Sequence, residues 1–264
     1  MNVEGKVALI TGGGAGIGRA TALALARRGC AVVLSYLEAM RERTEHTARE
    51  VVALGVTARA LPCDVTRDAD CRALVAATMR ECGRLDILVN NAGVTRFIPH
   101  ADLDALGDED WDLILGVNVK GTFHCARAAA PAIAASGGGE IINVASIAGI
   151  VAVGSSIPYA VSKSGVITLT KALARVLAPK IRVNAVAPGF VTGEWMRQGL
   201  GDRYEQAQRE WASAVPLERA CQPEDVADAI MSLITGSDLV TGQTLVCDGG
   251  ALIVDAVAKG VRGG

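Results

Sequence analysis

Aromatic side chains are scarce in this sequence: its 264 residues include only three Trp, three Tyr and three Phe. So few aromatic rings leave little material for a platform on which nucleic-acid bases could stack. Charged residues make up 20% of the chain and their net charge is -2, so there is no basic field to attract a polyanion either. The sequence therefore predicts no nucleic-acid partner.

Long apolar runs and paired cysteines are also missing. Even the most apolar windows fall short of the roughly 18 residues that a membrane span needs, and the N-terminus lacks the apolar stretch of a signal peptide. The seven cysteines include no C-x-x-C pair, which favours a reduced, intracellular compartment. His46, His100 and His124 lack the spacing of metal ligands. We expect a cytoplasmic protein with no membrane partner and no metal site.

Hydrophobic residues make up 50% of the chain, and short apolar runs alternate with helix-like segments from end to end. The predicted strands are 7–10, 31–34, 56–61, 87–89, 141–144, 181–186 and 244–246. The predicted helices are 17–28, 41–54, 71–82, 112–135, 159–177 and 224–233. Continuous apolar strands are typical of a parallel sheet that is covered on both faces. We therefore predict one α/β domain over residues 1–264, a doubly wound parallel sheet of the Rossmann type with helices on both faces.

Glycine is abundant, with 30 residues, and a dense cluster follows the first predicted strand as Thr11-Gly12-Gly13-Gly14-Ala15-Gly16-Ile17-Gly18. Glycines let a backbone turn tightly and approach a pyrophosphate, whose charge is met by the free N–H groups at the start of the next helix. Taken alone, the cluster would also suit a plain strand-to-helix connection. Its position directly after the first strand favours a dinucleotide site.

Tyr159 and Lys163 lie four residues apart at the start of a predicted helix, so both project from one face. An unperturbed Tyr has a pKa near 10, and a nearby ammonium group would lower the pKa of Tyr159 by about 1–3. Taken alone, the pair would suit any helix face. Ser146, however, follows the fifth predicted strand, and ligands bind where the ends of parallel strands meet. The three side chains are therefore candidates for proton-transfer chemistry.

Several motifs in this order resemble the short-chain dehydrogenase/reductase family, and the resemblance covers nearly the whole chain. The motifs are the TGxxxGxG turn at 11–18, Asp64-Val65, Asn90-Asn91-Ala92-Gly93, Pro188-Gly189 and Asp248-Gly249-Gly250. The resemblance implies a nicotinamide cofactor held by Thr11, Gly12, Gly14, Gly16, Ile17, Gly18, Ser35, Tyr36, Asp64, Val65, Asn91, Ala92, Gly93, Tyr159, Lys163, Pro188, Gly189, Val191 and Thr192. Two alternatives remain there: Asp64 could instead cap the turn before Thr66, and Thr192 stands one residue nearer to the proline than the family's usual threonine.

The resemblance also implies a catalytic set of Asn118, Ser146, Tyr159 and Lys163. In that interpretation Tyr159 exchanges a proton with the carbonyl or hydroxyl oxygen of the substrate, and Ser146 hydrogen-bonds the same oxygen. Lys163 tunes Tyr159 and holds the nicotinamide ribose, while Asn118 fixes a water that links Lys163 to solvent. Asparagine is a poor helix former, so we expect a local kink at Asn118; an exposed helix position is the alternative.

The end of the second predicted strand bears on the choice of cofactor. NAD-preferring proteins place an acid there to hold the ribose 2′-hydroxyl. This chain has Tyr36 instead, preceded by Ser35, whose hydroxyl could donate to a 2′-phosphate. Against this, NADP-preferring relatives often carry a basic residue where Ala15 stands, and Glu38 could swing towards the ribose. Two nearby arginines, at positions 41 and 43, are also compatible with solvated helix charges. NADP(H) is modestly favoured over NAD(H).

Together these features predict an NAD(P)-dependent oxidoreductase that interconverts a ketone and a secondary alcohol by hydride transfer, with a small-molecule carbonyl or alcohol as substrate. Two alternatives stay open. Residues 90–96 and 184–190 resemble the 3-oxoacyl-(acyl-carrier-protein) reductase branch of the family. A catalytically silent nucleotide-binding regulator would keep the same fold without turnover.

Residues 193–215 form the longest segment between predicted sheet elements and contain Trp195, Met196, Tyr204 and Trp211. The resemblance implies a lid over the substrate here, and these apolar side chains would then favour an apolar or mixed substrate; helix packing is the alternative. The resemblance also implies a homotetramer. Segments 112–135, 159–177 and 251–257 are apolar enough to form its contacts.

Overall fold

A seven-stranded parallel sheet forms the centre of the computed structural model, which describes residues 1–254. The strands are β1 (Val7–Thr11), β2 (Ala31–Tyr36), β3 (Ala58–Pro62), β4 (Ile87–Asn90), β5 (Gly139–Val144), β6 (Ile181–Pro188) and β7 (Thr244–Cys247). Their order across the sheet is β3-β2-β1-β4-β5-β6-β7, and every neighbouring pair is parallel. The predicted fold class is therefore confirmed.

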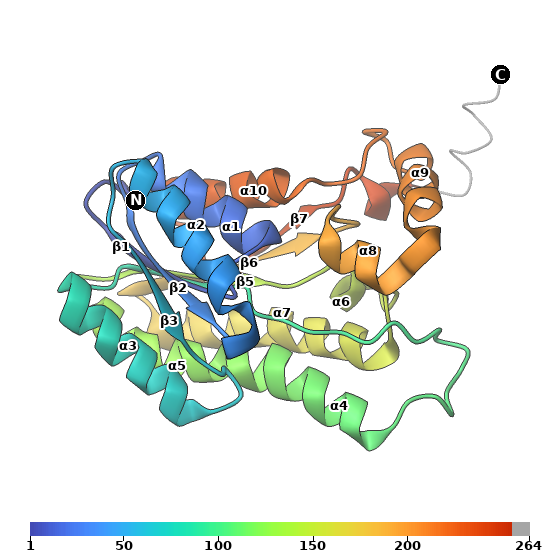
Figure 1. Ribbon diagram of the computed structural model, residues 1–264, viewed down its shortest axis with the longest axis horizontal. Helices are drawn as coiled ribbons and strands as arrows, with labels where there is room; N and C mark the ends of the chain where they lie inside the picture. The colour runs from blue at the N-terminus through green and yellow to red at the C-terminus, as the bar shows by residue number, and fades with distance from the viewer. Residues whose placement is uncertain (255–264) are drawn as a thin grey trace.

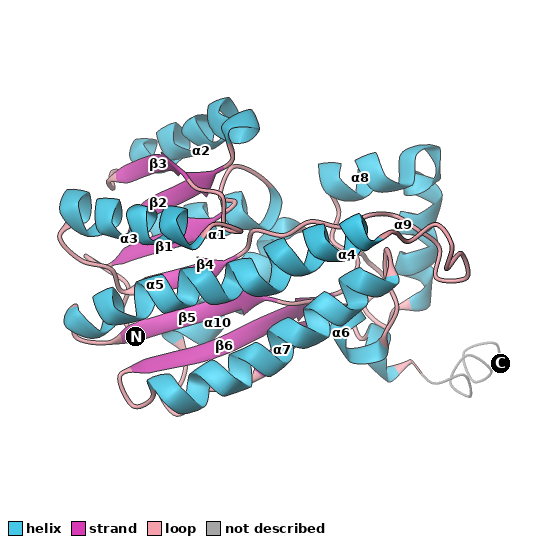
Figure 2. Cartoon of the chain, turned by 90° about the horizontal axis from the view of Figure 1, so that it is seen from below, coloured by secondary structure: helices cyan, strands magenta, loops and turns pink. Residues whose placement is uncertain are grey.

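Helices cover both faces of the sheet. They are α1 (Gly16–Ala26), α2 (Arg41–Ala53), α3 (Asp68–Cys82), α4 (Asp108–Leu115), α5 (Thr122–Ala135), α6 (Ala148–Val151), α7 (Ile157–Leu177), α8 (Glu194–Leu200), α9 (Tyr204–Ala214) and α10 (Pro223–Thr235). Short 3₁₀ segments are η1 (Glu38–Met40), η3 (Gly201–Arg203) and η4 (Ala251–Ile253), and η2 (Gly116–Gly121) is a π-helix. Figures 1 and 2 show α1, α2 and α10 on one face and α3, α5 and α7 on the other.

Two apolar cores lie between the sheet and its helix layers. Neighbouring residues of β1 face opposite ways, because side chains alternate along a strand. Ile10 joins the cluster that includes Ile230 of α10, whereas Leu9 joins the cluster that includes Ile133 of α5. All four side chains are fully buried. Because both faces are covered, the strands consist of continuous apolar runs, which is the pattern the sequence displays.

The chain reverses its direction of travel across the sheet at β1. From β1 the strands continue to β2 and β3 on one side, and then return to β4 through β7 on the other. In a doubly wound sheet a crevice forms at this switch, beyond the carboxyl ends of the strands, and ligands bind there. The loops that follow β1 and β4 therefore frame the candidate site.

The structure corrects the helix predicted over residues 112–135 in two respects. It begins earlier, at Asp108, because the backbone N–H of Gly107 donates to the Asp110 carboxylate (3.2 Å) and acidic residues fill the first turn. It is also interrupted, since Gly116–Gly121 adopts π-helical geometry. The kink expected at Asn118 is thus a local change of helix type, of the kind that often occurs at functional sites.

The segment 193–215 is largely helical. It contains α8, η3 and α9, and it follows the carboxyl end of β6. Figure 2 shows α8 and α9 beyond one end of the strands, outside the two helix layers. Of the segment 251–257, which we expected to contribute to a homotetramer, residues 255–257 lie outside the described residues.

The seven cysteines are free thiols, and five of them are buried, as expected for small apolar side chains. Within residues 1–254, no helix has both the length and the apolarity required to cross a membrane.

The first residue of β5 tests how tightly the sheet is packed. A Cβ atom at Gly139 would lie 1.9 Å from the backbone oxygen of Asp86, which cannot move without breaking the sheet. We expect Gly139→Ala to lower the free energy of unfolding by about 1–3 kcal/mol, measured by denaturant titration. Gly116→Ala is the control, because nothing lies within 4 Å of its Cβ position. Equal stability of the two variants would contradict the packing argument.

Candidate functional site

The glycine turn between β1 and α1 depends on residues without side chains. Gly12 and Gly16 have φ values of +65° and +49°, in the left-handed region that favours glycine. A Cβ atom at Gly18 would lie 2.5 Å from the carbonyl oxygen of Gly12 and 2.7 Å from Nδ2 of Asn91. The turn can therefore close against the start of α1 only with glycine at this position.

The start of α1 fits an anionic group. Its first turn contains no acidic residue, and Ala15 at the N-cap has no side chain that could cap the free N–H groups. Nothing lies within 4 Å of the Cβ position of Gly16, so there is open space beside the first residue of α1. Free N–H groups and the positive end of the helix dipole are the usual means of binding a phosphate. The residues present thus fit the pyrophosphate of a dinucleotide.

Asn91 braces the glycine turn from the neighbouring strand. Its Nδ2 atom donates to the carbonyl oxygens of Thr11 (3.0 Å) and Gly12 (2.9 Å). The Thr11 hydroxyl in turn accepts hydrogen bonds from the backbone N–H groups of Asn91 and Ala92, both at 3.0 Å. The carboxyl ends of β1 and β4 are thereby joined at the switch point. The side chains of Thr11 and Asn91 thus hydrogen-bond to the protein backbone, and these bonds fix the conformation of the turn.

The end of β2 is less open than the sequence suggested. Ser35 and Tyr36 are buried, with 1% and 5% of their surface exposed. The guanidinium of Arg41 lies 5.6 Å from the centre of the Tyr36 ring and pairs with Glu38 (2.8 Å). The charged groups exposed near this strand end are therefore those of η1 and α2, of which Arg43 is one.

Asp64 and Val65 follow β3. The Asp64 carboxylate accepts hydrogen bonds from the backbone N–H (2.9 Å) and the hydroxyl (2.7 Å) of Thr66, so it does cap the turn. Val65 is buried against Gly121, where a Cβ atom would lie 2.7 Å from the Val65 side chain. The backbone after β3 is therefore held against η2.

Lys163 is buried, with 4% of its surface exposed, and its Nζ atom donates to the carbonyl oxygen of Val144 at the end of β5 (2.8 Å). The same atom lies 5.6 Å from the centre of the Tyr159 ring. Desolvation lowers the pKa of Lys163 to about 8, because burial disfavours the charged amine. The amine therefore titrates close to neutral pH.

The pKa of Tyr159 moves in the direction opposite to the expected one. Part of the side chain is exposed, yet desolvation raises the pKa of Tyr159 to about 12, and a hydrogen bond with Ser146 only partly opposes this. The prediction of a lowered pKa was wrong. Lys163 lies alongside the ring and is itself desolvated, so its charge does not offset the cost of burying a phenolate.

Asn118 links three segments from its place in η2. Its Oδ1 atom accepts from the backbone N–H of Val94 (2.8 Å), and its Nδ2 atom donates to the carbonyl oxygen of Val94 (3.0 Å) and to the hydroxyl of Ser162 (2.9 Å). Ser162 donates to the carbonyl oxygen of Tyr159 (2.7 Å). With 1% of its surface exposed, Asn118 fixes the loop after β4 against the catalytic candidates of α7, and the alternative of an exposed helix position is excluded.

The predicted residues after β5 and β6 meet at the same edge. The Ser146 hydroxyl lies 3.5 Å from the carbonyl oxygen of Pro188, while the backbone N–H of Gly189 donates to the carbonyl oxygen of Cys247 (2.9 Å). Thr192 donates through its hydroxyl to Gln222 (2.6 Å), and the backbone of Val191 is bridged to Cys221. The loop after β6 is thereby anchored where it leads into α8.

The segment 193–215 reaches the catalytic candidates through α8. The Trp195 ring stands edge-on to the Tyr159 ring, with 6.4 Å between their centres. Further along α8, a Cβ atom at Gly199 would lie 1.9 Å from the Phe97 ring, so the loop after β4 packs directly on this helix. Trp211 and Tyr204 instead pack with Phe190. Helix packing thus explains those two rings, whereas Trp195 faces the site.

Ser162 and the Val144 carbonyl were missed by the sequence analysis. Ser162 has helical spacing from Tyr159, which is a weak signal, whereas a backbone carbonyl has no residue signature at all. Among residues 1–254, no three His, Cys, Asp or Glu side chains are grouped so that they could hold a metal ion.

The chain is similar over nearly its whole length to known reductases and dehydrogenases. The profile of the enoyl-(acyl carrier protein) reductase family matches residues 12–251. Ketoacyl reductase 2 of the granaticin polyketide synthase of Streptomyces violaceoruber is 44% identical over 248 residues, covering 94% of this chain and 96% of that protein. The 3-oxoacyl-[acyl-carrier-protein] reductase FabG of Thermotoga maritima is 38% identical, covering 96% and 100%. The solved structure of an NAD⁺-bound xylitol dehydrogenase is similar with a TM-score of 0.87 and 33% identity, covering 95% and 100%.

Asn118→Ala removes the hydrogen bonds that fix the loop after β4. We expect the free energy of unfolding to fall by about 1–3 kcal/mol, because buried polar groups lose their partners. Backbone amides around Val94 should exchange with deuterium about tenfold faster or more, measured by mass spectrometry. Asn184→Ala is the matched control: Asn184 is also buried and makes two backbone hydrogen bonds, with Val240 and Gln243. Unchanged exchange around Val94 in Asn118→Ala would contradict the proposed role.

Proposed function

The chain belongs to the short-chain dehydrogenase/reductase family, and we propose that Tyr159 is its acid/base and NADP(H) its preferred cofactor. The protein is an NAD(P)-dependent oxidoreductase that interconverts a ketone and a secondary alcohol. The observation that carries the proposal is the convergence of Tyr159, Lys163 and Ser146 beside an open phosphate-binding turn.

The residues that would hold the dinucleotide lie along the carboxyl edge of the sheet. The start of α1 would bind the pyrophosphate through its free N–H groups. Asp64 and Val65 would border the adenine, and Pro188, Gly189 and Val191 the nicotinamide. When bound, the nicotinamide supplies or accepts the hydride, and the protein aligns it with the substrate carbon. Absence of a carboxylate at Tyr36 supports NADP(H), although the buried Ser35 hydroxyl is a weaker candidate for the 2′-phosphate than the arginines of α2.

Tyr159 would give its proton to the carbonyl oxygen during reduction. A pKa of about 12 keeps the phenol protonated at neutral pH, which is the state that can donate. The reverse reaction needs the phenolate, which burial disfavours. The protein thus suits reduction at neutral pH. An oxidised nicotinamide beside the ring would lower the pKa of Tyr159, because it places a positive charge near the oxygen.

Ser146 would act on the substrate oxygen that Tyr159 protonates, and Lys163 would act in the transfer of that proton. The Ser146 hydroxyl, which already interacts with Tyr159, would stabilise charge on the substrate oxygen. Lys163, fixed by the Val144 carbonyl, would exchange a proton near neutral pH and contact the nicotinamide ribose. Asn118 is a positioning residue, since its side chain is occupied by Val94 and Ser162. A water between Asn118 and Lys163 stays a prediction.

The α8 helix would cover the substrate, with Trp195 next to Tyr159. Trp195 is 46% exposed and apolar, which fits a substrate with an apolar group beside its carbonyl. A 3-oxoacyl thioester is the second candidate substrate, and it is supported by what the two similar reductases are named for. The similar reductases are named for a catalysed reaction and give no support to the alternative of a catalytically silent regulator.

We also propose that the chain forms a single domain and that four copies of it assemble into a homotetramer in the cytoplasm. The outer faces of α5 and α7 leave apolar side chains exposed: Phe123 is 38% and Val176 is 70% exposed. They border one groove between these helices, together with Pro131 and Leu177. Exposed apolar surface of this kind is typical of contacts between subunits.

Tyr159→Phe tests the acid. We expect kcat/KM for ketone reduction with NADPH to fall by about 10²–10⁴-fold, because the proton donor is lost. Binding of NADPH, followed by its fluorescence, should change little, since the ring remains. Turnover would be measured as the loss of absorbance at 340 nm with a panel of ketones. Wild-type activity in this variant would refute the assignment, and loss of cofactor binding would show that the Tyr159 hydroxyl serves the binding site instead.

The raised pKa of Tyr159 predicts different pH profiles for the two directions. Reduction should change little between pH 5 and about 7, because the phenol stays protonated well below a pKa of about 12 and Lys163 stays charged below a pKa of about 8. Oxidation of the alcohol should rise by up to about tenfold for each pH unit, because the phenolate fraction rises in that proportion. Initial rates at limiting substrate give kcat/KM for each direction. An oxidation rate that is independent of pH would contradict Tyr159 as the base.

A further inference from the structure

An ion pair joins the two sides of the candidate site. Arg43 of α2 pairs with Glu194, the first residue of α8. The two side chains are 46% and 50% exposed, so both are accessible to solvent and to a ligand. They belong to elements that are far apart in the sequence, and the pair connects the end of the site beside β2 to the segment 193–215.

Arg43 stands beside the phosphate-binding turn because the first turns of α2 rest on it. A Cβ atom at Gly14 would lie 2.4 Å from the hydroxyl oxygen of Thr44, the next residue along α2. The Thr47 hydroxyl donates to the carbonyl oxygen of Gly14 (3.3 Å). In dinucleotide sites the ribose 2′ group is recognised at the end of the second strand, which leads into η1 and α2 here. Arg43 is therefore placed near the 2′ position.

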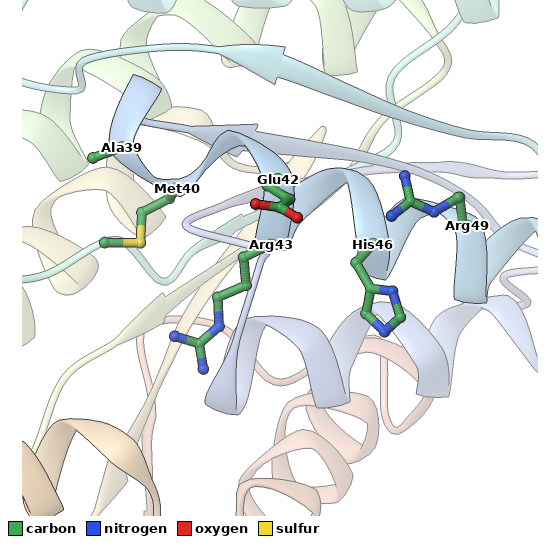
Figure 3. A pocket seen from close by; sticks show the side chains of 6 residues that line it. All are labelled: Ala39, Met40, Glu42, Arg43, His46 and Arg49. Atoms are coloured by element: carbon green, nitrogen blue, oxygen red, sulfur yellow. The ribbon is translucent and has the colours of Figure 1, made fainter.

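The surface around Arg43 carries charges of both signs. A shallow groove along α2 is lined by Ala39, Met40, Glu42, Arg43, His46 and Arg49. Figure 3 shows Arg43 and His46 extending from the same side of the helix, as expected for residues three apart. Arg43 is the arginine of this groove that pairs with Glu194, so an added phosphate would compete with that carboxylate for its guanidinium.

Glu194 stands next to the residue that contacts the catalytic candidate. Trp195, its neighbour in α8, lies edge-on to Tyr159. Because both residues belong to α8, making or breaking the ion pair of Glu194 affects the helix that positions Trp195. The ion pair connects the recognition of the ribose, at one end of the site, with the cover of Tyr159 at the other.

We propose that Arg43 determines cofactor specificity by choosing between Glu194 and the 2′-phosphate of NADP(H). The proposal rests on the proposed dinucleotide-binding function. With NAD(H), which has no 2′-phosphate, Arg43 stays paired with Glu194 and α8 stays joined to α2. With NADP(H), the 2′-phosphate takes the guanidinium and α8 is released from α2. Cofactor identity thus sets how firmly the segment 193–215 covers the substrate.

The exchange is physically reasonable because the two competitors differ in strength. An exposed ion pair between single charges contributes little, since water screens it. A phosphate carries up to two charges and accepts paired hydrogen bonds from a guanidinium, which is a stronger interaction. Glu194 therefore weakens binding of the 2′-phosphate without preventing it.

The test measures binding of 2′,5′-ADP and 5′-AMP by titration calorimetry, with no turnover required. The proteins are the wild type, Glu194→Gln, Arg43→Gln and the double variant. Glu194→Gln should bind 2′,5′-ADP about two- to fivefold more tightly, because the competitor is lost, and 5′-AMP unchanged. In the Arg43→Gln background, Glu194→Gln should have no effect. Glu205→Gln is the charge control: it removes an equally exposed acid of α9 that pairs with Arg197, and should leave the ratio of the two affinities unchanged.

Hydrogen exchange gives an independent measurement of α8. Amides 194–200 should exchange faster when 2′,5′-ADP is added to the wild type, and not when 5′-AMP is added. In Arg43→Gln the exchange should be fast without any ligand.

Three results would overturn the proposal while leaving the proposed function intact. Glu194→Gln could leave 2′,5′-ADP binding unchanged, or tighten 5′-AMP by the same factor, or retain its effect in the Arg43→Gln background, which would indicate general charge repulsion. Failure of the wild type to bind NADPH, NADH and both adenine nucleotides would instead reject the dinucleotide site itself, and this inference with it.

Discussion

The hydrogen bond from Lys163 to the carbonyl oxygen of Val144 is the contact on which the site depends. It fixes a buried amine on α7 to the end of β5. A buried amine without such a partner would be strongly disfavoured, because burial alone already lowers the pKa of Lys163 to about 8. Since Tyr159 stands one helical turn before Lys163, the same contact sets where the phenol lies relative to the strand ends.

A second set of polar contacts fixes the loops around this pair. Asn91 joins the glycine turn to β4, and Asn118 joins the next loop to α7. Both amides bind backbone groups, so they determine shape more than chemistry. Preorganisation of this kind matters because a proton donor and its acceptor must be held within hydrogen-bond distance before reaction. The polar side chains of the site thus divide into those that would face ligands and those that hold the loops.

The fold was predictable from the sequence because its signals are local. Apolar strands such as Val7–Thr11, and a glycine turn directly after the first of them, depend only on neighbouring residues. The π-helix at Gly116–Gly121 was predicted only as a kink, because its geometry depends on packing against Val65 and Ser162. The raised pKa of Tyr159 was missed for a similar reason: spacing shows that an amine is near, but burial decides which effect wins. The ion pair of Arg43 with Glu194 joins residues about 150 positions apart, and no pattern in the chain relates them.

Phe97 and Gly199 bring the loop after β4 into direct contact with α8. The Phe97 ring occupies the space where a side chain at position 199 would stand. The loop after β4 and α8 can therefore be in contact only because residue 199 is a glycine. Replacing that single hydrogen with even a methyl would push the two walls apart or rotate the ring. The residue at position 199 therefore limits how closely α8 can approach the loop after β4, independently of the residues that handle the proton.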